Sequence, residues 1–400
     1  MRRPGSSAAI PKRPPLRGAW TWIASLALLL LALLGGRALA AGAAQHAFHG
    51  FAPSQLMRAY NFGPLYQRGL SGKGQTIAFI EVDGFDQGDL TAFNRTYGLA
   101  QVQPTVYLPQ GATLQDIPPA EGETTMDLEY AHALAPGARL QVYEVLNAGD
   151  FSGYARGLSD ALRAAAAHGA TVISMSLRGT GNFFCSQLHA ARRMHATLEE
   201  VTAKGISVFA ASGDYGASPC QTHPLKVGTV YPAADPAVTA VGGTHLTLAR
   251  SGAYGGETAW DGSGGGDTSD FARPAWQHGR GALASSSREV PDVAFDADPA
   301  SGVAVRLQGK WHVIGGTSLG APCWAALWAL ATQAHHERTG RPLGWANPLL
   351  YGLANSPQRT RVFHDVTTGD NGYYQAGPGW DAVTGWGSPN ADALVQALAS

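Results

Sequence analysis

One serine in this sequence has the local setting of a nucleophile. Ser318 follows small residues in the stretch GGTSLGAP (315–322). Gly315 and Gly316 allow a sharp turn, and we expect Ser318 to cap the helix that follows, with Pro322 in its first turn. The positive end of that helix favours negative charge that develops beside the serine. The pattern predicts acyl transfer, but a plain N-cap serine has the same local sequence, and the stretch does not identify a base.

Two carboxylates, and no histidine, are placed to accept the proton of such a serine. Glu123 and Asp127 lie four residues apart in a predicted helix (122–134), and therefore on one of its faces. None of the 13 histidines stands in the His-Gly-Thr-His setting of a subtilisin-type site. The pair could face solvent, but no Lys or Arg occurs between Glu121 and Arg139, and the same face continues into apolar residues. Partial burial of close carboxyls raises at least one pKa, so the pair can act as a general base at acidic pH.

A further carboxyl, Asp214 in ASGDYGAS, follows a predicted strand and precedes a glycine. An aspartate in that position often does no more than stabilise a turn. If protonated, it could instead donate a hydrogen bond to the oxyanion of a tetrahedral intermediate, whereas an ionised carboxylate only accepts. This role also requires low pH.

The elements that must position these residues alternate along the chain. Apolar strands separated by amphipathic helices predict a parallel sheet covered on both faces, whose strand ends bring the polar candidates together. The expected strands are 76–82, 138–145, 170–176, 206–212, 237–244 and 302–307, and the expected helices are 122–134, 153–169, 185–205 and 321–338. We expect 251–290, rich in Gly, Ser and Asp, to form a long surface loop.

The N-terminal residues have a different composition from the rest. Residues 1–40 contain a basic stretch, an apolar run and a final A-x-A pattern, which predicts an export signal cleaved near Ala40. A retained anchor is the alternative, although the apolar run is shorter than the ~20 residues of a spanning helix. We therefore expect a secreted or periplasmic protein with one domain, 41–400, and no membrane association after cleavage. The formal net charge of -1 gives no reason to expect nucleic acid as a partner.

Three cysteines belong to the exported part. Cys323 lies in an apolar helix pattern, and we expect it to be buried and unpaired. Cys185 and Cys220 both follow predicted strand ends, so a disulfide between them is a hypothesis.

Several of these motifs together resemble the sedolisin family, the serine-carboxyl peptidases. E-x-x-x-D, S-G-D-x-G and G-T-S-x-x-x-P occur in the family's order, and the similarity runs from about residue 52 to the C-terminus. The resemblance implies a subtilisin-like α/β fold with a parallel sheet of roughly seven strands flanked by helices on both faces. It also implies roles for four residues: Ser318 as nucleophile, Glu123 as general base, Asp127 as its orienting partner and Asp214 as oxyanion donor.

The C-terminal stretch HDVTTGDNGYYQAGPGWDAVTG (364–385) resembles the family's calcium site. The resemblance implies that one structural Ca²⁺ is bound by two carboxylates and three backbone carbonyls, from Asp365, Asp381, Val366, Gly377 and Gly379. An all-oxygen donor set suits this ion. A Gly- and Asp-rich surface loop is the alternative interpretation.

The sequence also departs from the family's pattern. Only about a dozen residues separate the expected cleavage site from the first family-like segment, so we expect either folding without a covalent propeptide or a separately encoded propeptide or inhibitor as partner. Leu177 stands where relatives often have Trp, while Glu81 matches a glutamate of the family's catalytic network. The function expected is an exported, acid-active endopeptidase acting on peptide or protein substrates. The alternatives are a tripeptidyl exopeptidase of the same family and a non-catalytic binding protein on a peptidase scaffold.

Overall fold

The computed structural model describes residues 50–109, 112, 122–145, 151–177, 188–219, 227–281 and 285–400. The expected signal segment 1–40 lies outside these residues, and so do Cys185 and Cys220, whose disulfide stays a prediction. Cys323 is buried and carries a free thiol, as expected. Within the described ranges, no helix combines the length and the apolar character that crossing a membrane requires.

A mostly parallel sheet of eight strands forms the centre of residues 50–400, which confirms the predicted fold class. Seven strands are parallel, in the order β10-β6-β5-β4-β1-β3-β2, and β7 pairs antiparallel with β6 at one end. Their bounds are β1 Thr76–Glu81, β2 Thr105–Tyr107, β3 Arg139–Glu144, β4 Val172–Met175, β5 Ser207–Ala211, β6 Thr239–Leu248, β7 Tyr254–Ala259 and β10 Val293–Asp296.

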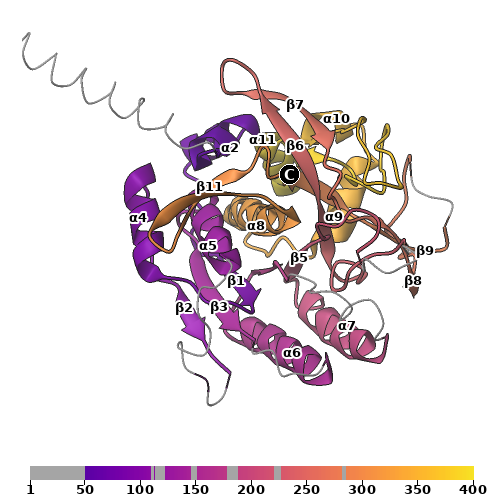
Figure 1. Ribbon diagram of the computed structural model, residues 1–400, viewed down its shortest axis with the longest axis horizontal. Coiled ribbons are helices and arrows are strands. Elements are labelled where there is room, and N and C mark those ends of the chain that lie inside the picture. Colours follow the sequence, from indigo (N-terminus) through magenta and orange to yellow (C-terminus); the bar gives the residue numbers. More distant parts are fainter. Residues whose placement is uncertain are drawn as a thin grey trace, which may run out of the picture. The chain divides into compact units, whose positions relative to one another are not determined.

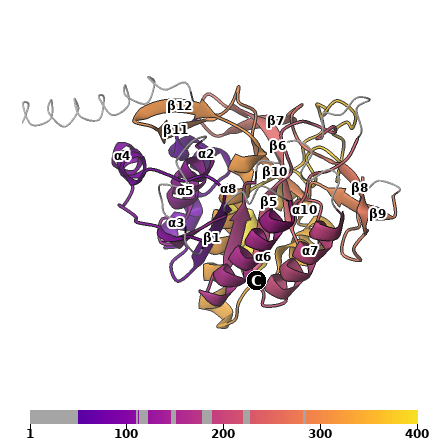
Figure 2. The ribbon, with the colours of Figure 1, turned by 60° about the horizontal axis from the view of Figure 1, so that its bottom comes forward.

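Helices cover both faces of this sheet. In Figure 1, α8 (Thr317–Thr339) lies in the middle of the molecule beside α5 (Glu123–Leu134), and α6 (Phe151–Ala167) and α7 (Leu188–Thr202) lie together on the other side of β1. Figure 2 shows α6 and α7 side by side on that face. Because successive residues of a strand point to opposite faces, β1 contributes Ile77 and Phe79 to the core under α5 and α8, and its intervening residues to the core under α6 and α7.

The remaining elements surround these layers. They are α2 Pro53–Ala59, α3 Gly63–Gln67, α4 Gln87–Tyr97, β8 Gly266–Ala272, β9 Ser287–Val290, β11 Val303–Leu307, β12 Lys310–Ile314, α9 Ala346–Ala354, α10 Arg359–Val362, β13 Phe363–His364, β14 Ser388–Pro389 and α11 Ala391–Ala399. The strand expected at 302–307 forms, but it pairs antiparallel with β12 in a separate hairpin.

The expectation of a long surface loop over 251–290 is wrong. This stretch contains β7, β8 and β9, and it ends in a fully buried pair of charged residues. The guanidinium of Arg288 donates to both carboxylate oxygens of Asp292, at 2.8 and 2.6 Å. A charged side chain can be buried when its partner is buried with it, so polar composition alone misjudged this region.

The start of α8 also differs from the expectation. The helix begins at Thr317 after Gly316, whose φ of 126° suits a glycine, and Ser318 is its second residue, not its cap. Pro322 therefore lies inside the helix, beyond the first turn. The first backbone N–H of the helix, that of Thr317, is satisfied from another part of the chain, which is why no local serine cap is needed.

Candidate active site

The carboxyl ends of the parallel strands bring the candidate residues to one edge of the sheet. Glu81 is the last residue of β1, Ser176 follows β4 and Asp214 lies just beyond β5. The N-termini of α5 and α8 contribute Glu123 and Ser318. This edge is where ligands bind in open α/β sheets.

Asp214 contacts the residue that precedes the serine. Its Oδ1 accepts hydrogen bonds from the backbone N–H and the hydroxyl of Thr317, both at 2.8 Å. The Thr317 hydroxyl oxygen in turn accepts the backbone N–H of Gly213 at 3.0 Å. A Cβ on Gly316 would lie 2.9 Å from Oδ2 of Asp214, so the glycine allows this carboxyl to approach the backbone. Asp214 itself is exposed, within reach of solvent and substrate.

Glu123 is fixed by the tight turn at the start of α5. Gly122, at φ 83°, caps the helix, and a Cβ there would lie 2.7 Å from Cδ2 of Leu307 in the β11–β12 hairpin. Glu123 is half-buried as the first helical residue, and Asp127 follows one turn later, fully buried. The pair therefore does not face solvent, which answers the alternative that the sequence left open.

The two halves of the site meet through Ser176. Its hydroxyl oxygen lies 2.7 Å from Oδ2 of Asp127 and 3.1 Å from the backbone carbonyl oxygen of Ser318. Asp127 and Asp214 therefore both contact the turn that presents Ser318, one through Ser176 and one through Thr317.

Burial favours the protonated, neutral forms of the carboxyls at this edge. Burial raises the pKa of Asp127 well above its ordinary range, and the neighbouring charge of Glu123 adds to the effect. Burial also raises the pKa of Glu81 well above its ordinary range, with further contributions from Asp127 and Glu123. The pKa of Glu144, at the end of β3 beside Glu81, rises to about 8 through burial and the charge of Asp83. At acidic pH these carboxyls are therefore held in their protonated forms.

Sequence reasoning missed two members of this cluster. Ser176 was noted only through its neighbour Leu177, which is buried. Glu144 lies inside the apolar run that predicts the strand 138–145, and the run by itself does not mark it. A charged residue at the end of a strand buried on both faces is itself a signal, because such strands read as nearly continuous apolar runs.

The expected calcium ligands come together in the C-terminal segment. Both carboxylate oxygens of Asp365 accept the backbone N–H of Gly379, at 3.2 and 3.1 Å. Oδ2 of Asp381 accepts that of Gly377 at 3.1 Å. Burial raises the pKa of Asp381 to about 6.

The backbone carbonyls expected there remain available as ligands. In the described part of the chain, those of Val366, Gly377 and Gly379 accept no hydrogen bond. No cluster of three or more His, Cys, Asp or Glu side chains occurs among the described residues, but this donor set uses only two. Two carboxylates and three carbonyls fit a hard cation.

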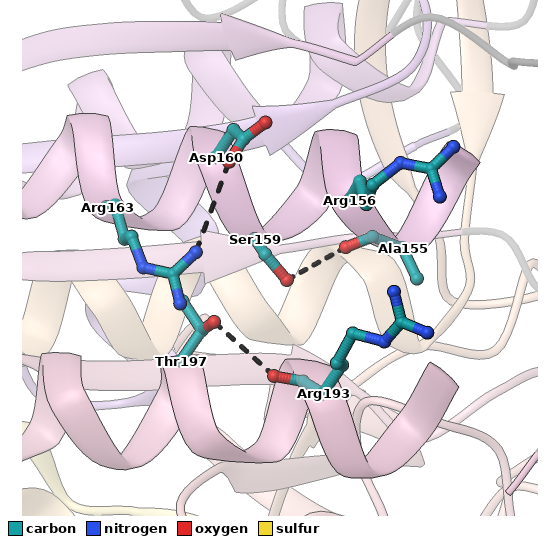
Figure 3. Close-up of a pocket in the computed structure, with 7 residues that line it drawn as sticks. All are labelled: Ala155, Arg156, Ser159, Asp160, Arg163, Arg193 and Thr197. Carbon is teal, nitrogen blue, oxygen red and sulfur yellow. Dashed lines mark hydrogen bonds and ion pairs between the residues drawn. The ribbon is translucent and has the colours of Figure 1, made fainter. Parts of the chain in front are cut away.

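A separate hollow of about 100 Å³ lies between α6 and α7 (Figure 3). Its hydroxyls are used within their own helices: Ser159 donates to the Ala155 carbonyl at 2.8 Å, and Thr197 to that of Arg193 at 3.4 Å. Among the described residues, no carboxylate accepts a hydrogen bond from either hydroxyl in the way that Asp127 does from Ser176, so the hollow does not compete as the catalytic site.

Comparison with known proteins identifies the same architecture. The sequence model of the Subtilase family matches residues 120–387. Kumamolisin from Bacillus sp. (strain MN-32) is 38% identical over 370 residues, which are 87% of this chain and 63% of that protein. Tripeptidyl-peptidase 1 from Dictyostelium discoideum is 28% identical over 81% of this chain and 54% of its own length. The chain thus spans between about half and two thirds of the length of these relatives.

A solved structure agrees with the sequence matches. Pseudomonas sedolisin, a serine-carboxyl proteinase complexed with two molecules of pseudo-iodotyrostatin, superposes with a TM-score of 0.72 at 29% identity. The superposition covers 87% of this chain and 97% of that one.

Proposed function

Because this chain belongs to the sedolisin branch of the subtilase family, the serine-carboxyl type of serine peptidase, we propose that it is an exported, acid-active endopeptidase. Its substrates are peptides or proteins. The observation that carries the proposal is the convergence of two carboxyls, Asp127 and Asp214, on the turn that presents Ser318.

The proposed reaction uses each residue in one role. Ser318 Oγ attacks the scissile carbonyl carbon while Glu123 accepts the hydroxyl proton. Asp214, protonated on Oδ2 because Oδ1 already accepts two hydrogen bonds, donates to the developing oxyanion. The tetrahedral intermediate collapses, the C–N bond breaks, and the amine leaves with the proton from Glu123. Water then hydrolyses the acyl-enzyme by the same steps, which regenerates Ser318.

The local charge supports acidic conditions. A base surrounded by buried carboxyls ionises only after its neighbours have taken up protons, and the oxyanion donor must itself be protonated. Both requirements can be met together at low pH, and the second fails once Asp214 has lost its proton.

A pH–rate profile on a denatured protein tests this function. Activity should peak well below about pH 6, where a histidine base would be protonated. Ser318→Ala and Glu123→Gln should each remove at least ~99% of kcat, since each takes away the nucleophile or its base. Maximal activity near neutral pH, or full activity of Glu123→Gln, would refute the assignment.

A tripeptidyl exopeptidase is the second candidate, and similarity to tripeptidyl-peptidase 1 favours it. The two activities differ in the chain end that they need. Blocking the N-terminus of a peptide substrate abolishes tripeptide release but leaves internal cleavage unchanged, so mass spectrometry of the products distinguishes them.

We also propose that residues 365–381 hold one structural Ca²⁺. Asp365 and Asp381 would supply carboxylates, and Val366, Gly377 and Gly379 would supply carbonyls. A bound ion would neutralise two carboxylates whose hydrogen bonds come from backbone N–H groups and, for Asp381, also from the Thr384 hydroxyl, and would order this segment. Its contribution is to stability, and no step of the reaction uses it.

Export is the remaining part of the proposal. It rests on residues 1–40, and the mature N-terminus should begin just after Ala40. N-terminal sequencing of protein recovered from outside the cytoplasm checks this, and refolding with and without a candidate helper chain checks whether a propeptide acts in trans.

A further inference from the structure

The hydroxyl of Ser176 has one proton and two acceptors. Oδ2 of Asp127 lies 2.7 Å from its oxygen and the carbonyl oxygen of Ser318 lies 3.1 Å from it. All three groups are buried, so water does not replace a missing partner. A single O–H can serve only one acceptor well, and the protonation of Asp127 therefore decides which acceptor it serves.

The carbonyl of Ser318 depends on this hydroxyl because of the sequence that follows it. In an α-helix its donor would be the backbone N–H of the residue four positions later. That residue is Pro322, which lies inside α8 and has no N–H. The helix thus leaves the carbonyl of the nucleophile to be satisfied from β4.

We propose that Ser176 is a positioning residue that couples the protonation of Asp127 to the backbone of Ser318. With Asp127 protonated, its Oδ2–H donates to Ser176, and Ser176 donates to the Ser318 carbonyl, so both O–H groups have an acceptor and the carbonyl has a donor. With Asp127 ionised, Ser176 donates to the carboxylate and the Ser318 carbonyl loses its donor. The backbone of the nucleophile is held at acidic pH and released as pH rises. The inference rests on the proposed function only in treating Ser318 as the nucleophile.

The groups around Asp127 favour the protonated arrangement. Its own helix contributes the Glu123 carboxyl. The other groups are the carboxyl of Glu81 at the end of β1, that of Asp83 just after it, that of Glu144 at the end of β3, and the buried thiol of Cys323 in α8. None of these groups carries a positive charge; the interactions that favour an ionised Asp127 are its hydrogen bonds with the Ser176 hydroxyl and, less strongly, with Glu81.

The first test does not need activity. In an inactive Ser318→Ala background, which keeps the backbone carbonyl, Pro322→Ala supplies the missing N–H. Proline's effect on the unfolded chain is independent of pH and cancels when two pH values are compared. Pro322→Ala should therefore raise Tm by about 2 °C more at about pH 8, where the carbonyl lacks its donor, than at about pH 4. With Ser176→Ala added, the effect of Pro322→Ala should be equal at both values. The proposal would be overturned if Pro322→Ala changed Tm equally at both pH values while Ser176 is present. It would also be overturned if the pH dependence of that change persisted after Ser176→Ala.

The second test measures turnover. Ser176→Ala should lower kcat about fivefold with little change in KM, a loss equivalent to one net hydrogen bond. Adding Pro322→Ala should restore most of the lost kcat. Ser174→Ala is the matched control: Ser174 is a buried serine of β4, the strand that Ser176 follows, and its hydroxyl has no hydrogen-bond partner in the described part of the chain. It should leave kcat unchanged. If the wild-type protein cleaves nothing, the proposed function fails while the thermal test still decides the coupling. An equal loss of kcat in Ser176→Ala with and without Pro322→Ala refutes the coupling.

Discussion

Glu144→Gln should make the protein more resistant to neutral pH. Glu144 ends β3, lies beside Glu81 in the parallel register and is 4% exposed. Its Oε2 has no hydrogen-bond partner among the described residues. Glutamine has nearly the size of a protonated glutamic acid but cannot ionise, so the variant mimics the acid form at every pH.

The magnitude follows from the pKa. Burial, aided by the charge of Asp83, raises the pKa of Glu144 from 4.5 to about 8. Because the folded pKa is raised, the carboxyl stabilises the native state fully below about pH 4.5, and this contribution is lost as pH rises toward about 8. Each unit of pKa corresponds to ~1.4 kcal/mol, so ionisation of the wild-type residue costs the native state up to ~5 kcal/mol by about pH 8. The variant avoids that cost.

Urea unfolding of both proteins in the Ser318→Ala background, which prevents self-digestion, measures the effect. The free energies of unfolding should agree within ~1 kcal/mol near pH 4 and diverge by ~2–5 kcal/mol in favour of glutamine near pH 8. Glu200→Gln is the control: Glu200 is exposed and paired with Arg163, whose hydrogen bond lowers its pKa, so its removal should never stabilise at higher pH. A difference for Glu144→Gln that is constant from acidic to neutral pH would refute the reasoning.

Three further outcomes follow from the site and the C-terminal segment. Excess chelator should lower Tm by several degrees in the wild type and have no further effect in Asp381→Asn; an unchanged Tm argues against the Ca²⁺ site. Asp214→Ala should lower kcat by ~100-fold with little change in KM, in line with loss of an oxyanion donor; an equal rise in KM instead indicates a binding role. Gly122→Ala should destabilise more than Gly98→Ala, because both glycines have positive φ but only the first would clash, with Leu307; equal unfolding free energies contradict this.

How far the sequence predicts the fold depends on whether the signal is local. The strands β1, β3, β4 and β5 are apolar runs between helical periodicities, and each forms within one or two residues of its expected bounds. The stretch 251–290 misleads because some of its charged groups are satisfied by residues far away in the sequence, such as Tyr60 for Glu257, which composition does not reveal.

The site residues also divide into those with a local sequence signal and those without one. Glu123 and Asp127 share a helix face, so their spacing alone predicts that they lie together and turn inward. Ser176 could not be predicted from spacing, because its role arises where β4 meets α8 in space. The cap of α8 was mispredicted for a similar reason: Asp214, from the loop after β5, accepts the Thr317 N–H that a local serine was expected to accept.

The acidic pH of the proposed reaction and the stability of the fold have a common physical origin. Carboxyls without a role in the proposed reaction are also buried: burial raises the pKa of Glu257, and raises that of Asp296 well above its ordinary range. Glu257, in β7, accepts hydrogen bonds from Tyr60 and Thr244, at 2.6 and 2.7 Å, and so joins the C-cap of α2 to β6. Between the ordinary pKa of a carboxyl and these raised values the native state binds more protons than the unfolded chain, so stability falls as pH rises. Conditions that protonate the oxyanion donor therefore also protonate the carboxyls on which packing depends, and a shift of the active pH range toward neutrality would require changes in both.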